Sequence, residues 1–192
     1  MHTAPQSLLV RSRSWVRHLG FIFNLFSQTL AWTIHLQYNA NIAHIIDFGL
    51  SKEFRDPTTH AYIPLKKGLG LIGTTAFASI NSHLGLELGR QDDLESLAYV
   101  LFYFLWGFFP WQGLKLKGQE ILKSKQGITT HALFHGLPPK LRTFFKHCCS
   151  LSFKDKPNYD HFCDIFNSLL AKEEFQGDVE FNWDLADAKI LG

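Results

Sequence analysis

The chain has 192 residues, of which 46% are hydrophobic and 19% are charged, and its formal net charge is +2. This composition supports a packed core and excludes an extensively disordered chain. Three cysteines, two of them adjacent, give no framework for a disulfide scaffold and fit a reducing compartment. The near balance of 19 Lys and Arg against 17 Asp and Glu argues against a general nucleic-acid-binding protein.

Charge is distributed unevenly, because residues 1–46 contain no Asp, Glu or Lys. Residues 1–18 are basic and rich in serine, which is one composition of a mitochondrial transit peptide. Residues 19–36 are apolar but too often interrupted by polar residues for a membrane span, so no membrane association is expected. Their apolar positions instead favour a helix over 19–36 that lies on the domain, with residues 24–40 packed against 94–105. We therefore treat 1–40 as an unassigned segment and 41–192 as a domain. We expect the protein in the cytoplasm or nucleus, or in mitochondria if residues 1–18 act as a transit peptide.

The elements of the domain follow from hydrophobic pattern and from breaking residues. Ile42 to Phe48 reads as a short buried strand, and residues 50–90 read as a long ordered loop. Asp92 and Asp93 suit a helix N-terminus, and the helix continues through the apolar run 94–105 to Gly107. Because this helix is apolar nearly all round, we expect it at the centre of the core. Further helices are predicted at 117–126, 139–149 and 159–172, so the fold class is mainly α.

The strand ends in Asp47-Phe48-Gly49, a triplet that protein kinases use to bring a carboxylate to Mg²⁺. The triplet alone is weak evidence, but an ordered series of further segments follows it. These are Arg55-Asp56, Thr59-His60, Ile63-Pro64, Gly73-Thr74, Ser79-Ile80-Asn81, His83-Leu84-Gly85, Asp92 to Leu97, Pro110 to Lys115 and Asp155-Lys156-Pro157. The series resembles the C-terminal lobe of the casein kinase I family of Ser/Thr protein kinases, over about residues 41–192.

This resemblance implies a kinase-like C-terminal lobe with a small β element at the Asp-Phe-Gly loop. It implies that Asp47 binds Mg²⁺, that Phe48 and Gly49 set its orientation, and that ATP is the cofactor. It places Gly73 and Thr74 in the activation segment and makes Asp93 a buried structural acid at the start of the central helix. Ser79-Ile80-Asn81 stands where most kinases carry Ala-Pro-Glu, a replacement that marks this family. The expected partners are protein substrates or docking proteins.

Other parts of a kinase are absent from the sequence as given. A kinase uses a Gly-rich loop, a strand Lys paired with a helix Glu, and a catalytic His-Arg-Asp before the Asp-Phe-Gly. Since no Asp, Glu or Lys precedes Asp47, this chain is expected to be inactive alone. Two hypotheses follow: part of an active protein kinase, or a pseudokinase-type module that binds proteins.

Gly68 to Gly73 spells G-x-G-x-x-G, but it follows the Asp-Phe-Gly triplet and no strand with a lysine comes after it. We therefore interpret these glycines as part of the activation segment and not as a nucleotide-binding loop.

Basic residues near the predicted substrate side are Lys66, Lys67 and Lys115, which are candidates to bind phosphate or acidic substrates. The alternative for these lysines, and for Lys117, Lys123 and Lys125, is an ordinary solvated face. By the family resemblance, Leu69 and Ala76 stand where a Lys and an Arg are expected, so substrate recognition looks weakened.

His131 and His135 share a helical face at i, i+4 spacing and precede Cys148 and Cys149, which makes a zinc site imaginable. Adjacent cysteines lack the spacing typical of zinc ligands, so no metal other than Mg²⁺ at Asp47 is predicted.

Overall fold

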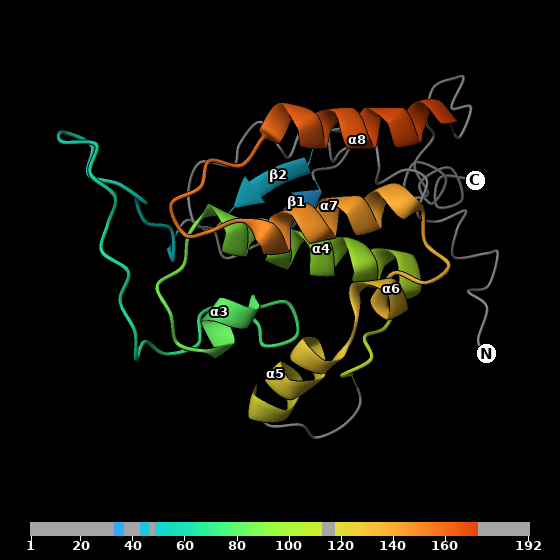
Figure 1. The fold of residues 1–192 in the computed structure, drawn as a ribbon, viewed down its shortest axis with the longest axis horizontal. Helices are drawn as coiled ribbons and strands as arrows, with labels where there is room; N and C mark the ends of the chain where they lie inside the picture. Colours follow the sequence, from blue (N-terminus) through green and yellow to red (C-terminus); the bar gives the residue numbers. More distant parts are fainter. Residues whose placement is uncertain (1–32, 37–42, 47–48, 113–117, 173–192) are drawn as a thin grey trace, which may run out of the picture.

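The structure is a computed structural model that describes residues 33–36, 43–46, 49–112 and 118–172 (Figure 1). From residue 49 onward the described part of the chain is mainly α, with six helices and no strand. The helices are α3 (Ile80–His83), α4 (Arg90–Trp106), α5 (Gly118–Gly127), α6 (Thr130–Leu133), α7 (Pro139–Ser150) and α8 (Tyr159–Lys172). None of these helices is long and apolar enough to cross a membrane.

Upstream, two four-residue strands, β1 (Thr33–Leu36) and β2 (Ala43–Ile46), pair antiparallel with Thr33 opposite Ile46. The prediction of a helix over 19–36 is therefore wrong for 33–36, where the β-branched Thr33 and Ile34 suit a strand. The rest of that predicted helix, and its predicted packing on the central helix, lie outside the described residues. Strand β2 falls within the predicted strand Ile42 to Phe48, whose two ends lie outside them as well.

Helix α4 forms the centre of the core, as its apolar run predicts. Leu94, Leu97 and Phe102 are almost fully buried, and the helix packs against α7, which in turn packs against α6 and α8 (Figure 1). The helix begins at Arg90, two residues before the predicted start, because Gly89 is its N-cap. It ends at Gly107, whose φ of 78° is the left-handed conformation that glycine adopts without strain.

The predicted helices at 117–126, 139–149 and 159–172 are confirmed to within a residue or two as α5, α7 and α8. Pro139 occupies the first turn of α7, where its missing N–H costs nothing, and the Asn158 side chain accepts from the His161 N–H at the start of α8 (3.0 Å). Edge-to-face contacts from Phe144 to Phe162 and to Phe166, with ring centroids 5.0 and 5.3 Å apart, join α7 and α8.

The predicted loop 50–90 is largely confirmed, but α3 interrupts it, and two local pairings give it order. One pairing is a turn in which Arg55 bridges Tyr62, closed by the Asp56 side chain, which accepts from the Thr58 and Thr59 N–H groups. In the other, Lys67 bridges Leu86. These two pairings fix the course of residues 54–70, which we call the ribbon.

Candidate functional site

The residues of the Ser79-Ile80-Asn81 segment are fixed to α4 by hydrogen bonds. The Ser79 hydroxyl caps α3 by accepting from the Ser82 N–H at 3.1 Å. The Ile80 N–H donates to Glu95 Oε1 at 3.1 Å, and Asn81 Nδ2 donates to Asp92 Oδ1 at 3.0 Å. The three residues that carry the strongest part of the sequence resemblance therefore converge on the first turns of the central helix.

Asp92 serves two elements at once. Its Oδ2 accepts from the Gly89 N–H at 2.8 Å, which satisfies a free donor at the N-terminus of α4, while its Oδ1 holds Asn81. Burial raises the pKa of Asp92 above its ordinary value, and the hydrogen bonds from Gly89, Ser79 and Asn81 oppose that rise. Sequence reasoning assigned the helix start to Asp92 and Asp93; the structure instead makes Asp92 the residue that accepts from the N-cap backbone.

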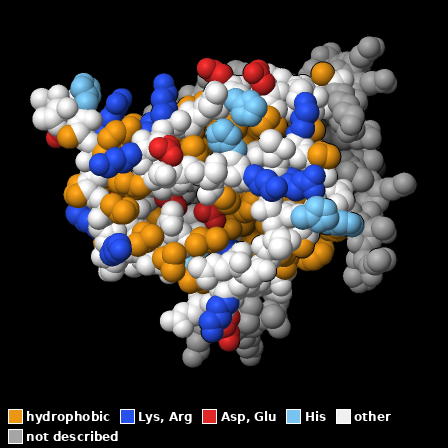
Figure 2. All heavy atoms as spheres, viewed as in Figure 1, with side chains coloured by type: hydrophobic (Ala, Val, Ile, Leu, Met, Phe, Trp, Pro, Cys, Tyr) orange, Lys and Arg blue, Asp and Glu red, His pale blue; other side chains and the backbone are white. Residues whose placement is uncertain are grey.

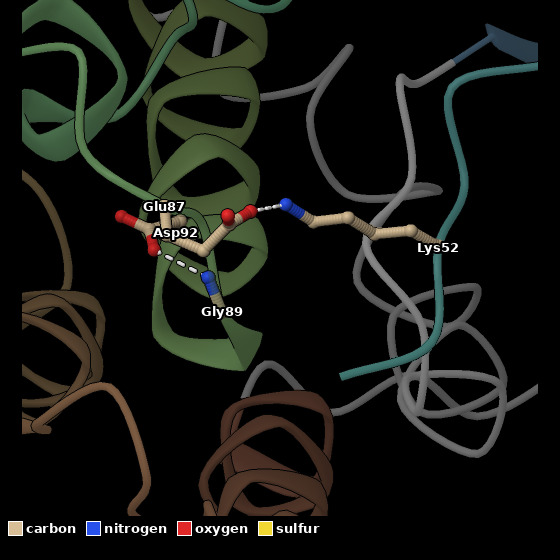
Figure 3. A network of polar contacts seen from close by, with 4 residues as sticks. All are labelled: Lys52, Glu87, Gly89 and Asp92. Carbon is tan, nitrogen blue, oxygen red and sulfur yellow. Dashed lines mark hydrogen bonds and ion pairs between the residues drawn. The ribbon is translucent and has the colours of Figure 1, made fainter. Parts of the chain in front are cut away.

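Lys52 and Glu87 form an ion pair beside Asp92 (Figure 3). Glu87 is buried, whereas Lys52 is half-buried, and partial burial lowers the pKa of Lys52. The pair joins the segment after the predicted Asp-Phe-Gly triplet to the residues just before α4. Because Glu87 pairs with Lys52 and Asp92 holds Gly89 and Asn81, both carboxylates are already used within the protein.

Glu95 lies one turn further along α4 and is buried. Its Oε1 accepts from Tyr99 Oη at 2.8 Å as well as from the Ile80 N–H. Burial raises the pKa of Glu95 to about 7, and burial next to this carboxylate raises the pKa of Tyr99. A carboxyl group in the core is thus held by two donors, one from the backbone of α3 and one from its own helix.

Lys125 is a residue of this region whose burial the sequence did not predict. It was expected on a solvated face, but only 4% of it is exposed. Its Nζ donates to the carbonyl of Ala78 at 2.6 Å and to that of Thr75 at 3.2 Å. Burial lowers the pKa of Lys125 to about 7, and the nearby Glu95 opposes the fall. One signal was available: Lys125 is four residues after the buried Ile121 and so lies on the same face of α5.

Aromatic rings complete the surroundings of Lys125. Its ammonium group lies 4.4 Å from the ring centre of Tyr99 and 5.2 Å from that of Trp111, both on the ring faces. Trp111 in turn donates from Nε1 to the Ala76 carbonyl at 3.1 Å. The segment 75–78 therefore has three of its carbonyls bonded by side chains of α5 and of the loop after α4.

We call this region the α3 junction: the segment 74–83 together with Asp92, Glu95, Tyr99, Trp111 and Lys125. Figure 2 shows carboxylates near the centre of the viewed face, with apolar side chains around them. Inside the junction the polar groups bond one another or the backbone. The arrangement therefore fixes the course of the segment 74–83, which is a positioning role and not that of a reacting centre.

The remaining predicted site residues are placed as follows. Gly73 is exposed with φ 90°, and Thr74 is exposed, its carbonyl accepting from the N–H groups of Phe77 and Ala78. Asp93 is buried in the first turn of α4, as predicted. Gly49 is exposed in a turn, and Lys66 and Lys67 are exposed on the ribbon that pairs with 84–87. Asp47, Phe48 and Lys115 lie outside the described residues.

The two histidines considered as zinc ligands do not have the helical arrangement expected from their spacing. Helix α6 ends at Leu133, so His131 and His135 do not share a helix face, although their rings lie 6.1 Å apart. Within the described ranges, no three His, Cys, Asp or Glu side chains come together as metal ligands. A search for protein-family models that match this sequence finds none.

Proposed function

We propose that the chain is a casein kinase I-like C-terminal lobe that does not phosphorylate proteins by itself. The observation that carries this proposal is the bonding of Ser79-Ile80-Asn81 to the first turns of α4 through Asp92 and Glu95. In the sequence resemblance these are two separate motifs, and their contact supports reading them as parts of one lobe. The buried Asp93 in the same helix turn supports the same reading.

The proposed inactivity rests on chemistry that this stretch of chain does not supply. Phosphoryl transfer depends on positioned groups that hold the nucleotide phosphates and on a residue that accepts the substrate proton. Residues 1–46 hold no Lys, Asp or Glu for those tasks. The single predicted Mg²⁺ ligand, Asp47, does not replace them.

A chimera gives the sharpest test. The N-terminal lobe and catalytic loop of an active casein kinase I would be joined ahead of Asn41, and phosphorylation of an acidic peptide would be measured. We expect the chimera to be active and its Asp47→Ala variant to lose at least a hundredfold in rate, since the Mg²⁺ ligand is then missing. Asp160→Ala, at an exposed position of α8, is the control. A folded chimera that neither binds ATP·Mg²⁺ nor phosphorylates would contradict the proposal.

The chain itself should give no phosphorylation of the same peptide and no thermal shift with ATP·Mg²⁺. Phosphorylation by the chain alone that disappears in Asp47→Ala would show that the inactivity is wrong while leaving the family assignment in place.

A second candidate function is protein binding without catalysis. It is favoured by the side chains of Leu65, Leu71 and Leu84, which are 40–51% exposed on and beside the ribbon that carries Lys66 and Lys67. Apolar and basic side chains on one ribbon suit an extended acidic peptide. Fluorescence anisotropy with a labelled acidic peptide tests this. We expect binding that a Lys66→Glu/Lys67→Glu variant weakens about tenfold or more and that a Lys123→Glu/Lys146→Glu control leaves unchanged.

A further inference from the structure

His83, the last residue of α3, lies between Thr75 and helix α5. Its ring is half-buried, with Nε2 3.1 Å from the Thr75 carbonyl oxygen and 3.4 Å from Lys125 Nζ. The ring also hydrogen-bonds the backbone of Gly118, at the start of α5. One imidazole thus contacts the segment 74–83 and both ends of α5.

The two contacts of Nε2 make opposite demands. To bond the Thr75 carbonyl, Nε2 must carry a hydrogen; to accept from the Lys125 ammonium, it must present a lone pair. A neutral imidazole cannot meet both demands through one nitrogen. The Thr75 carbonyl is moreover shared, because Lys125 Nζ donates to it at 3.2 Å. The pair can therefore hold one positive charge, with the Thr75 carbonyl as the shared acceptor, whereas a second positive charge sets two cations side by side.

The charged groups around this pair are few. Helix α4 contributes Glu95 and, next to it, the phenol of Tyr99. Helix α5 contributes Lys125 itself, and the segment 75–78 contributes no titratable side chain. Asp92 acts on Glu95 and not directly on the pair. Among the described residues, a single carboxylate thus balances the single positive charge.

Acidification removes this charge balance in two ways, by neutralising Glu95 and by adding a charge to His83. As the pH falls, Glu95 takes up a proton, since burial raises its pKa to about 7. A proton on His83 then places a second cation 3.4 Å from the buried Lys125 ammonium group, on a ring that is itself half-buried. Two unbalanced cations at this distance, one of them buried, repel each other. Separation of the two elements that carry them relieves the repulsion.

We propose that His83 and Lys125 form an acid-sensitive latch that holds α5 against the segment 74–83 at neutral pH and releases it on acidification. Helices α4, α7 and α8, which pack through apolar side chains, stay in place when the latch opens. The latch is a local switch. It does not rest on the kinase-like role proposed above, because it depends only on contacts within the α3 junction.

Amide hydrogen exchange of the full chain tests the latch, with rates corrected for the intrinsic effect of pH. The relevant amides are those of Ala78, His83 and Leu84, which donate to Thr74, Ser79 and Ile80 carbonyls. We expect their protection to fall at least tenfold between pH 7.5 and pH 5.5, while amides in the middle of α7 keep theirs. Unchanged protection of the segment over this pH range would overturn the proposal.

The variant His83→Gln keeps a donor for the Thr75 carbonyl but cannot become a cation. We expect its segment 74–83 to show the same protection at both pH values, whereas the control His131→Gln, at an exposed position of α6, behaves as the wild type. A loss of protection in His83→Gln equal to that of the wild type would overturn the proposal.

If His83→Gln does not fold, NMR titration of the wild-type imidazole decides. The latch requires His83 to be neutral at pH 7 and to gain its proton together with the loss of protection. Protonation of His83 without any change in exchange would overturn the proposal.

Discussion

Asn81 Nδ2 donates to Asp92 Oδ1 at 3.0 Å, and this bond joins α3 to the first turn of α4. Asp92 is buried, its other oxygen accepts from the Gly89 N–H, and the Ser79 side chain also hydrogen-bonds this carboxylate.

Removal of this donor should destabilise the protein measurably. We expect Asn81→Ala to lower the free energy of unfolding by about 1–3 kcal/mol, because a buried carboxylate loses one of its hydrogen-bond donors. Asn81→Asp should cost more, since it places a second carboxylate against the first. Urea unfolding followed by circular dichroism measures both. The control is Asn167→Ala, at an exposed position of α8, which should change stability by less than about 0.5 kcal/mol.

The buried Glu95 should make stability depend on pH in a particular direction. Its pKa is about 7 in the fold against an ordinary value of 4.5, so the folded protein binds this proton more tightly than the unfolded chain. The contribution of Glu95 to stability is therefore complete below about pH 4.5 and is lost as the pH rises through about 7.

Glu95→Gln isolates this effect because the amide keeps an acceptor for Tyr99 and the Ile80 N–H but does not titrate. We expect the wild type to gain about 1–3 kcal/mol relative to Glu95→Gln as the pH falls from 8 to 5. Urea unfolding at a series of pH values checks it. A constant difference between the two proteins, or a gain in the opposite direction, would show that Glu95 is not protonated near neutrality.

Arg90 holds two loops together at the start of α4. Its guanidinium carbon lies 4.3 Å from the ring centre of Phe54, and its Nη2 donates to Tyr62 Oη at 3.2 Å and to the Asp155 carbonyl at 3.0 Å. Because a lysine ammonium cannot stack and branch in this way, we expect Arg90→Lys to cost about 1–3 kcal/mol. The turn 54–63 should also become sensitive to limited proteolysis at native conditions. Arg142→Lys on α7 is the matched control and should leave the cleavage pattern unchanged.

Gly85 is required where the chain leaves α3. Its φ is 66°, and a Cβ there would lie 2.5 Å from the Leu69 carbonyl oxygen, a contact that no side chain tolerates. We expect Gly85→Ala to separate the ribbon from 84–87 and to lower the melting temperature by several degrees. Gly70→Ala, in the same ribbon but with no atom within 4 Å of its Cβ position, should leave the melting temperature within about one degree. Equal effects of the two substitutions would contradict this account.

The longer helices could be predicted from sequence because each has a sustained apolar pattern and clear boundaries. Gly107 ends α4, Pro139 begins α7 and Asn158 precedes α8. The short helices α3 and α6 could not, because four residues do not establish a helical period. Their only signals are the caps, Ser79 and Thr129, whose hydroxyls accept from backbone N–H groups three residues later.

The candidate site was less predictable than the fold. Burial of Asp93 followed from the resemblance, but the second role of Asp92, as a partner for Asn81, depends on how the chain returns to α4. The burial of Lys125 depends on carbonyls 47 and 50 residues away, at Ala78 and Thr75. Lysine is a poor residue to bury, so a sequence rule places it on the surface unless the fold supplies these acceptors.

The buried apolar cluster is drawn entirely from residues 94–169, whereas the described residues 49–75 add none to it. The two parts should thus have different opening free energies, as separate cooperative units. Residues 49–75 would open and close many times during the lifetime of one folded molecule, while the cluster stays closed until global unfolding. Destabilising substitutions in residues 49–75 would therefore reduce the fraction of time for which these residues are ordered. They would not raise the rate of global unfolding.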